Sequence, residues 1–98
     1  MPEPVRLYLI LYDISEPRRW RRVFKALKAH GAWAQLSVFF CRLPETRALR
    51  LEDMLKKTID PATDRLLIID LGDAARAPMR IAAHGAISLP GAPQLAIV

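Results

Sequence analysis

Apolar side chains fill a short stretch near the start of the chain almost without interruption. From Val5 to Tyr12 every residue except Arg6 is apolar or aromatic, and Asp13 follows with no spacer. A run this short, rich in Leu, Ile, Val and Tyr, is typical of a strand buried on both faces. The pattern therefore predicts a central β-strand over residues 5–13, with a carboxylate where the strand leaves the sheet.

Both faces of this strand are apolar, so other parts of the structure must cover each of them. Alternation directs the odd positions from Val5 to Leu11 to one side and Tyr8, Ile10 and Tyr12 to the other. One layer of helices covers only one side of a sheet. We expect another copy of the protein to cover the second.

A helix should follow immediately, over about residues 16–30. Ser15 or Glu16 can cap it, Pro17 suits the first turn, and Gly31 is a natural end. Apolar residues at helical spacing form the stripe that should face the core: Trp20, Val23, Phe24 and Leu27.

The later elements follow the same logic, with two ambiguities. Residues 32–43 read as extended, either one strand with a bulge near Ser37 or two separate strands. A second helix is predicted over about 45–57 and another central strand over 65–71, whereas 79–83 fits a short strand or one helical turn. The buried stripe predicted for the second helix is Leu51, Met54, Leu55 and Ile59.

The tail after these elements is apolar, with Pro and Gly spacing, so we expect it to be held against a sheet edge. The order of elements predicts one α+β domain over residues 1–98, a sandwich of two helices on a mainly antiparallel sheet.

The net charge of the chain indicates which kind of partner it binds. The 98 residues carry 15 Lys and Arg against 10 Asp and Glu, a net charge of +5. A small basic domain is typical of proteins that bind nucleic acid, although a merely basic soluble protein has the same composition. Cys41 is the only cysteine, which excludes an internal disulfide and a zinc cluster, and we expect it to be buried.

No membrane attachment is expected. No apolar segment approaches the ~18 residues of a membrane span, and the N-terminus lacks a basic region followed by a hydrophobic one. These features predict a cytoplasmic protein.

The positive charge is concentrated in the first predicted helix. Like charges at helical spacing repel one another, so they form either a solvated face or a surface for an anionic ligand, and we favour nucleic acid. The helix presents Arg18, Arg19, Arg21, Arg22, Lys25 and Lys28, with no acid after Glu16.

Three further polar residues have simpler interpretations. Asp13 can bind a cation, or it can cap the turn or pair with Arg18 or Arg19. Asp70, inside the last strand, is expected to point outward or pair with an arginine. His84 has no second histidine nearby and is expected at the surface.

Two motifs together resemble a known family. Tyr12-Asp13-Ile14-Ser15 after an apolar strand, an Arg-rich helix, and then Gln35-Leu36-Ser37-Val38-Phe39 match in order and spacing over about residues 5–72. The combination is similar to the small CRISPR-associated adaptation protein, the CRISPR-associated endoribonuclease that forms the non-integrase subunit of the spacer-acquisition complex.

The resemblance implies a ferredoxin-like β-α-β-β-α-β fold with an added C-terminal strand, in a homodimer whose sheets face each other. The C-terminal tail, about residues 86–98, would then reach across to the partner copy. The resemblance also implies that Asp13 binds a divalent metal, usually Mg²⁺.

Further site residues follow from the same resemblance. It gives Tyr12, Arg22 and Phe39 roles in the site. The sequence departs from the family at Trp33, near where a basic residue is common, at Leu36, where tyrosine is common, and at Trp20, where some members have arginine.

A metal-dependent mechanism would require two copies of the chain. Mg²⁺ is held by one or two carboxylates plus phosphate oxygens, so we expect it to be shared between the two Asp13 of a dimer. Arg22 and its neighbours would neutralise flanking phosphates, and Ser37 or Tyr12 would orient the site.

Three functions remain open at this point. The chain is a metal-dependent endonuclease acting on RNA or DNA, or a non-catalytic scaffold for double-stranded DNA beside the integrase subunit. The third possibility is a ferredoxin-like dimer that regulates another protein.

Overall fold

The computed structural model describes residues 2–87 of the 98 in the chain. Its elements follow one another with short connections. In chain order they are β1 (Val5–Asp13), α1 (Pro17–His30), β2 (Ala32–Gln35), β3 (Val38–Pro44), α2 (Glu45–Thr58), β4 (Arg65–Asp73) and the 3₁₀ helix η1 (Ala77–Arg80).

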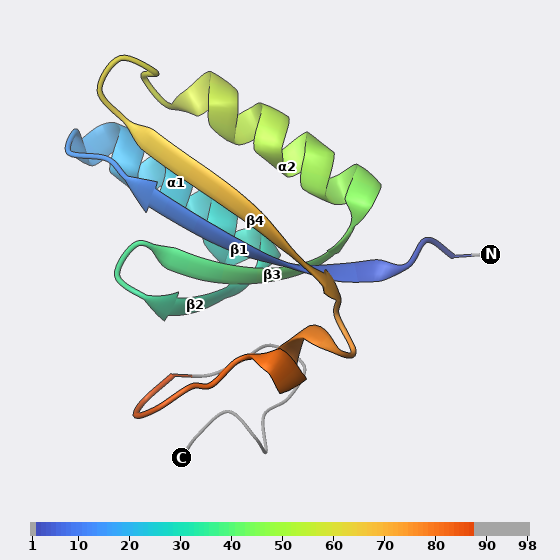
Figure 1. Ribbon diagram of the computed structural model, residues 1–98. Coiled ribbons are helices and arrows are strands. Elements are labelled where there is room, and N and C mark those ends of the chain that lie inside the picture. The colour runs from blue at the N-terminus through green and yellow to red at the C-terminus, as the bar shows by residue number, and fades with distance from the viewer. Residues whose placement is uncertain (1, 88–98) are drawn as a thin grey trace.

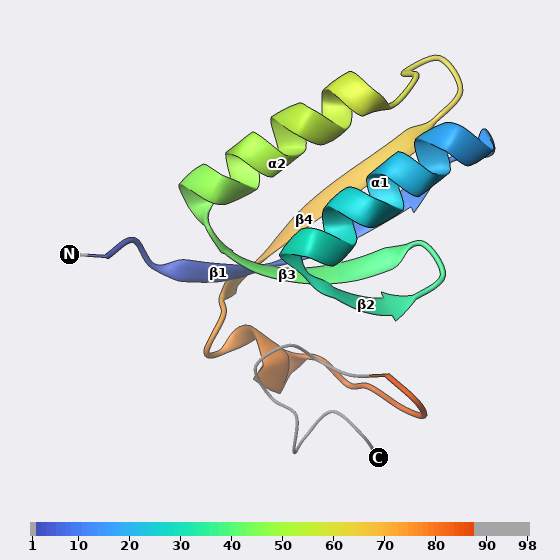
Figure 2. The ribbon, with the colours of Figure 1, turned by 180° about the vertical axis from the view of Figure 1, so that it is seen from behind.

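The four strands form one antiparallel sheet in the order β2-β3-β1-β4. Both helices lie on the same face of that sheet, as Figures 1 and 2 show from opposite sides. This is the ferredoxin-like β-α-β-β-α-β arrangement predicted from the sequence. The expected C-terminal strand falls almost wholly on residues 88–98, outside the described residues, and 86–87 are not in a strand.

Alternation along β1 divides its side chains as predicted. Tyr8, Ile10 and Tyr12 lie between the sheet and the helices and are at most 6% exposed. They pack with Val23 and Leu27 of α1, which are fully buried. Burying each large apolar side chain of this kind contributes roughly 1.5–3 kcal/mol, so this layer is the main source of stability.

The opposite face of the sheet is covered in part by the same chain, which corrects the expectation that only a second copy would cover it. Leu7 and Phe40 are buried there by Ala74 and Ala77. Partly buried residues complete this second cluster: Leu9, Ala34, Leu71, Ile81 and Ala83. Figure 1 shows the segment that carries η1 beyond the sheet, on the side away from the helices.

Among residues 2–87, the cover over this face is incomplete towards β4. The prediction of a central strand over 65–71 is wrong in this respect, because β4 is an edge strand of the sheet that these residues form, and its apolar residues Leu67 and Ile69 are 57% and 38% exposed. The 79–83 ambiguity resolves into a 3₁₀ turn, Ala77–Arg80, followed by a segment without regular structure.

Residues 32–43 form two strands joined by a tight hairpin, which resolves the second ambiguity. Leu36 and Ser37 make the turn, and Leu36 has φ +29°, a left-handed conformation that costs energy for a residue with a Cβ. The sequence lacks the Asn-Gly or Gly that usually occupies such turns, which is why a bulge is equally compatible with the sequence pattern.

The helix ends follow the capping rules. Glu16 is the N-cap of α1 and accepts hydrogen bonds from the backbone N–H of Arg18 (3.1 Å) and Arg19 (2.8 Å). Gly31 ends α1 where any Cβ would fall 2.4 Å from the Phe40 carbonyl oxygen, so a close approach of backbone requires glycine. The predicted stripe of α2 is wrong at Met54, which is 41% exposed.

A buried ion pair joins α1 to the loop before β4. Arg19 donates from Nε to Oδ2 of Asp64 at 2.8 Å, and the Asp64 side chain is 1% exposed. The same carboxylate accepts the backbone N–H of Asp60 at 2.8 Å. The Arg19 hydrogen bond, followed by the Asp60 N–H, holds the pKa of Asp64 below its ordinary value.

Two other polar predictions are confirmed. Asp70 pairs with Arg6 at 2.9 Å, next to a β-bulge at which Gly72 takes φ +97°. Cys41 is fully buried, and burial raises the pKa of its thiol to about 11. None of the helices formed by residues 2–87 has the length and apolar character to cross a membrane.

We expect Asp64→Asn to lower the melting temperature at pH 7 by about 5 °C or more, because Arg19 would lose its charged partner. The folded-state pKa of Asp64 is depressed, so its contribution is complete above the unfolded value near 3.9 and disappears as pH falls through the folded value. The difference in melting temperature between wild type and variant should therefore shrink below about pH 4.

The matched control is Asp53→Asn. Asp53 pairs with Lys57 at 2.9 Å, but the side chains are 61% and 76% exposed, so the loss should be close to zero. Equal shifts for Asp64→Asn and Asp53→Asn would show that the buried pair has no special role.

Candidate nucleic-acid and metal site

Asp13 stands free at the end of the central strand. It is the last residue of β1, its side chain is exposed, and its Cα pairs with that of Arg65 on β4. Within residues 2–87 its carboxylate makes no hydrogen bond or ion pair. The capping and pairing roles considered as alternatives for Asp13 belong to Glu16 and Asp64.

Alternation places Asp13 on the same side of the sheet as Leu11, away from the helices. The strand register aligns Leu67 and Val38 with Leu11 in one apolar row, and Ile69 and Phe40 with Leu9 in the next. Asp13 and Arg65 form the row beyond these. The acid therefore lies at the rim of the incompletely covered apolar face.

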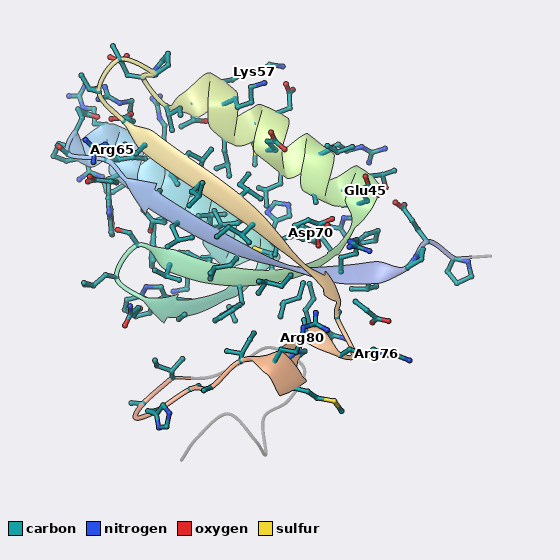
Figure 3. The ribbon with its side chains drawn as sticks, viewed as in Figure 1. Glu45, Lys57, Arg65, Asp70, Arg76 and Arg80 are labelled. Atoms are coloured by element: carbon teal, nitrogen blue, oxygen red, sulfur yellow. The ribbon has the colours of Figure 1, made fainter. Side chains whose placement is uncertain are left out.

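A shallow depression of about 350 Å³ marks this rim. Figure 3 shows Arg65 at the end of the sheet where β1 ends. The depression is lined by Leu11, Tyr12, Asp13, Arg65, Leu66 and Leu67. It thus combines one acid and one base on an apolar floor.

Tyr12 is adjacent in sequence, but its ring lies on the helix side. It is 5% exposed and packs against Phe39, with ring centroids 6.3 Å apart. The phenol oxygen is buried and has no hydrogen-bond partner among the described residues. Burial raises the pKa of Tyr12, and nearby Ser37 opposes the rise without reaching hydrogen-bond geometry.

The remaining predicted residues are not brought into one cavity. Ser37 is close to the strand end, since its carbonyl accepts the backbone N–H of Tyr12 at 3.1 Å. Phe39 is fully buried and meets Phe24 edge-on at 5.5 Å, so its contribution is to packing. Arg22 lines a different depression from that of Asp13.

Most of the predicted basic residues do form one surface. A second depression, of about 240 Å³, lies along the exposed side of α1. It is lined by Arg18, Arg21, Arg22 and Lys25. Arg19 is the exception, because its guanidinium is bound to Asp64 and its side chain is 27% exposed.

The donor set around Asp13 is small. Residues 2–87 contain no group of three His, Cys, Asp or Glu side chains placed to hold a metal ion. A free carboxylate at an exposed strand end nevertheless fits Mg²⁺, which keeps several waters and uses one or two carboxylates. One chain can thus supply one protein ligand.

Arg65 is the site residue that the sequence did not identify. Its only signal was its position at the start of the last strand. The strand register that sets it opposite Asp13 is a property of the folded sheet.

Comparison with known proteins gives one consistent result. The family model for CRISPR associated protein Cas2 matches residues 6–79. The chain is 44% identical over 78 residues to the CRISPR-associated endoribonuclease Cas2 1 of Rhodospirillum rubrum, covering 80% of this chain and 76% of that one. It is 42% identical over 79 residues to the CRISPR-associated endoribonuclease Cas2 of Geobacter sulfurreducens, covering 81% and 83%.

Solved structures agree on the fold. The structure of Streptococcus pyogenes Cas2 superimposes with a TM-score of 0.69 at 26% identity, covering 78% of this chain and 95% of that one. A hypothetical protein from Thermus thermophilus, TT1823, gives 0.65 at 35% identity, covering 67% and 80%.

Proposed function

Because the chain belongs to the family of CRISPR associated protein Cas2, we propose that it is a metal-dependent endonuclease that acts in CRISPR adaptation with the integrase subunit. Its substrate would be RNA or DNA, bound by the cations of α1 and Arg65. The names of its relatives describe endoribonucleases, which supports hydrolysis of a phosphodiester as the reaction.

The observation that carries the proposal is the free carboxylate of Asp13. An exposed acid in a basic chain, without an ion-pair partner in the described part, is available for a cation. Arg65 is paired with Asp13 across the two strands, so a phosphate bound there would be neutralised by Arg65 while Asp13 remains available to hold a cation.

A second copy of the chain would complete the site. We propose a homodimer through the sheet face that residues 74–83 leave incompletely covered. Leu67 and Ile69 would be buried by the partner copy, and the row beyond them contains Asp13. Two Asp13 carboxylates near a two-fold axis would then share one Mg²⁺.

Each residue of the proposed site would have a separate role. A bound Mg²⁺ would supply polarisation of the phosphodiester toward attack by water. Asp13 would hold the cation, Arg65 would neutralise the adjacent phosphate, and Arg18 and Arg22 would fix phosphates farther along the backbone. Tyr12 and Phe39, buried beneath the strand end, would hold that end rigid.

A scaffold for duplex DNA within the adaptation complex is the second candidate. Two observations favour it: each chain supplies a single carboxylate, and the α1 cations line a depression separate from that of Asp13. A scaffold needs cations along its surface but no metal.

We expect Asp13→Asn to lower the rate of oligonucleotide cleavage at least about a hundredfold, because even indirect partners of metal ligands cost 10–100-fold when removed. Binding measured by fluorescence anisotropy should stay within about threefold, because the cations remain. Asp53→Asn removes the same charge from α2 and serves as the control.

Cleavage that Asp13→Asn leaves unchanged would reject the enzyme and leave the scaffold. Cleavage that persists in excess EDTA would reject metal dependence.

We expect Leu67→Asp to convert a dimer into a monomer. Light scattering should give twice the 11.1 kDa chain mass for the wild type and 11.1 kDa for the variant, because a carboxylate in an apolar interface is costly. Cleavage should be lost as well, since each monomer retains one Asp13.

Leu49→Asp is the matched control. Leu49 lies on α2 and is 57% exposed, the same as Leu67. A monomeric wild type, or dimers lost equally in both variants, would contradict the proposed interface.

We expect the double change Arg18→Gln and Arg22→Gln to weaken binding to all duplex sequences alike. The slope of log affinity against log salt should fall by about 0.9 for each phosphate that the variant no longer neutralises. The change Arg47→Gln and Arg50→Gln alters the net charge equally on α2 and should preserve the slope. Equal effects of the two pairs would mean that net charge alone governs binding.

A further inference from the structure

Trp33 combines high exposure with a fixed orientation. The side chain is 55% exposed at the edge strand β2. Its Nε1–H donates to the carbonyl oxygen of Leu36 at 2.9 Å, across the strained hairpin turn. Its ring meets that of Phe24 at 89°, with centroids 5.9 Å apart. The indole ring of Trp33 is thus held in a fixed orientation with one face exposed to solvent.

The support beneath this ring is itself aromatic. Phe24 stacks on Trp20 with centroids 5.1 Å apart and planes 10° apart. The Lys28 ammonium stands 5.8 Å from the centroid of Phe24. A side chain held in this way loses little freedom on binding a ligand, so stacking on it would cost little entropy.

The charge around these rings has one sign. No acidic residue occurs between Glu16 and Glu45, a stretch that contains α1, β2 and β3. Lys28 lies beside Phe24, and Arg21, seven residues earlier on α1, falls on nearly the same side of the helix. Both are exposed, and neither forms an ion pair within residues 2–87. Aromatic faces next to unpaired cations are the surface that binds single-stranded nucleic acid, with bases stacked and phosphates neutralised.

We propose that Trp33 is a stacking site for an unpaired nucleobase, and that Lys28 and Arg21 bind phosphates of the same strand. The proposal rests on the function proposed above only in requiring that the protein bind nucleic acid. An acidic protein surface could also contact an exposed tryptophan, but a π-face flanked by cations suits a base and its phosphate together.

This site is distinct from the rim that contains Asp13. Trp33 pairs with Phe39 and lies on the helix side of the sheet at its outer strand, whereas Asp13 lies on the other side of β1. A strand bound at both places would pass around the β2 edge.

Tryptophan fluorescence tests the proposal directly, since the chain has two tryptophans. In a Trp20→Phe protein, Trp33 is the single emitter, and an oligothymidylate of about 12 nucleotides should quench it on binding. In the Trp33→Phe protein, where Trp20 emits, the same titration should leave the emission nearly unchanged. A duplex of equal length should quench Trp33 far less than the single strand.

Two substitutions then separate stacking from packing. Trp33→Phe keeps an aromatic face, and Trp33→Leu keeps an apolar contact with Phe24 without one. We expect Trp33→Leu to bind the oligothymidylate about tenfold more weakly than Trp33→Phe, with no change in salt slope. Lys28→Gln should instead lower the slope by about 0.7.

Equal affinities of Trp33→Phe and Trp33→Leu, or binding without quenching of Trp33, would overturn the stacking site and leave Trp33 to a protein partner. A wild type that binds neither single strand nor duplex would instead reject the proposed function. Circular dichroism melts of both variants check that each is folded at the assay temperature.

Discussion

Strand β1 has apolar side chains on both faces, and two helices can shield only one of them. The side with Tyr8, Ile10 and Tyr12 is closed by α1 and α2. The side with Leu7 is closed by residues that follow β4, but this cover thins toward Leu67. Much of the architecture follows from how water is excluded from that second side.

The same constraint determines where the chemistry can occur. Asp13 ends β1 on the side with incomplete cover, one row beyond Leu11 and Leu67. Whatever covers that side approaches the carboxylate, so the apolar surface and the acid are linked by strand register. An acid on the helix side would have met the core and required a buried partner, as Asp64 does with Arg19.

Local patterns were sufficient to predict much of the fold. Runs of apolar residues located β1 and β4, and Pro17 and Gly31 bracketed α1, because these signals depend on neighbours in sequence. Interactions between distant segments escaped prediction. Neither the pairing of Arg19 with Asp64 nor the position of Arg65 beside Asp13 has a local signal. The burial of Phe39 was not predicted either: the family resemblance linked this residue to the site, and in the structure its side chain lies fully buried in the core.

The fully buried thiol of Cys41 has a practical consequence. With its pKa near 11, almost no thiolate exists at neutral pH, so maleimide reagents will react with it very slowly. A cysteine introduced at an exposed position would therefore be labelled selectively without removing Cys41. Pairs of spin labels attached in this way would report the separation of two associated chains in solution.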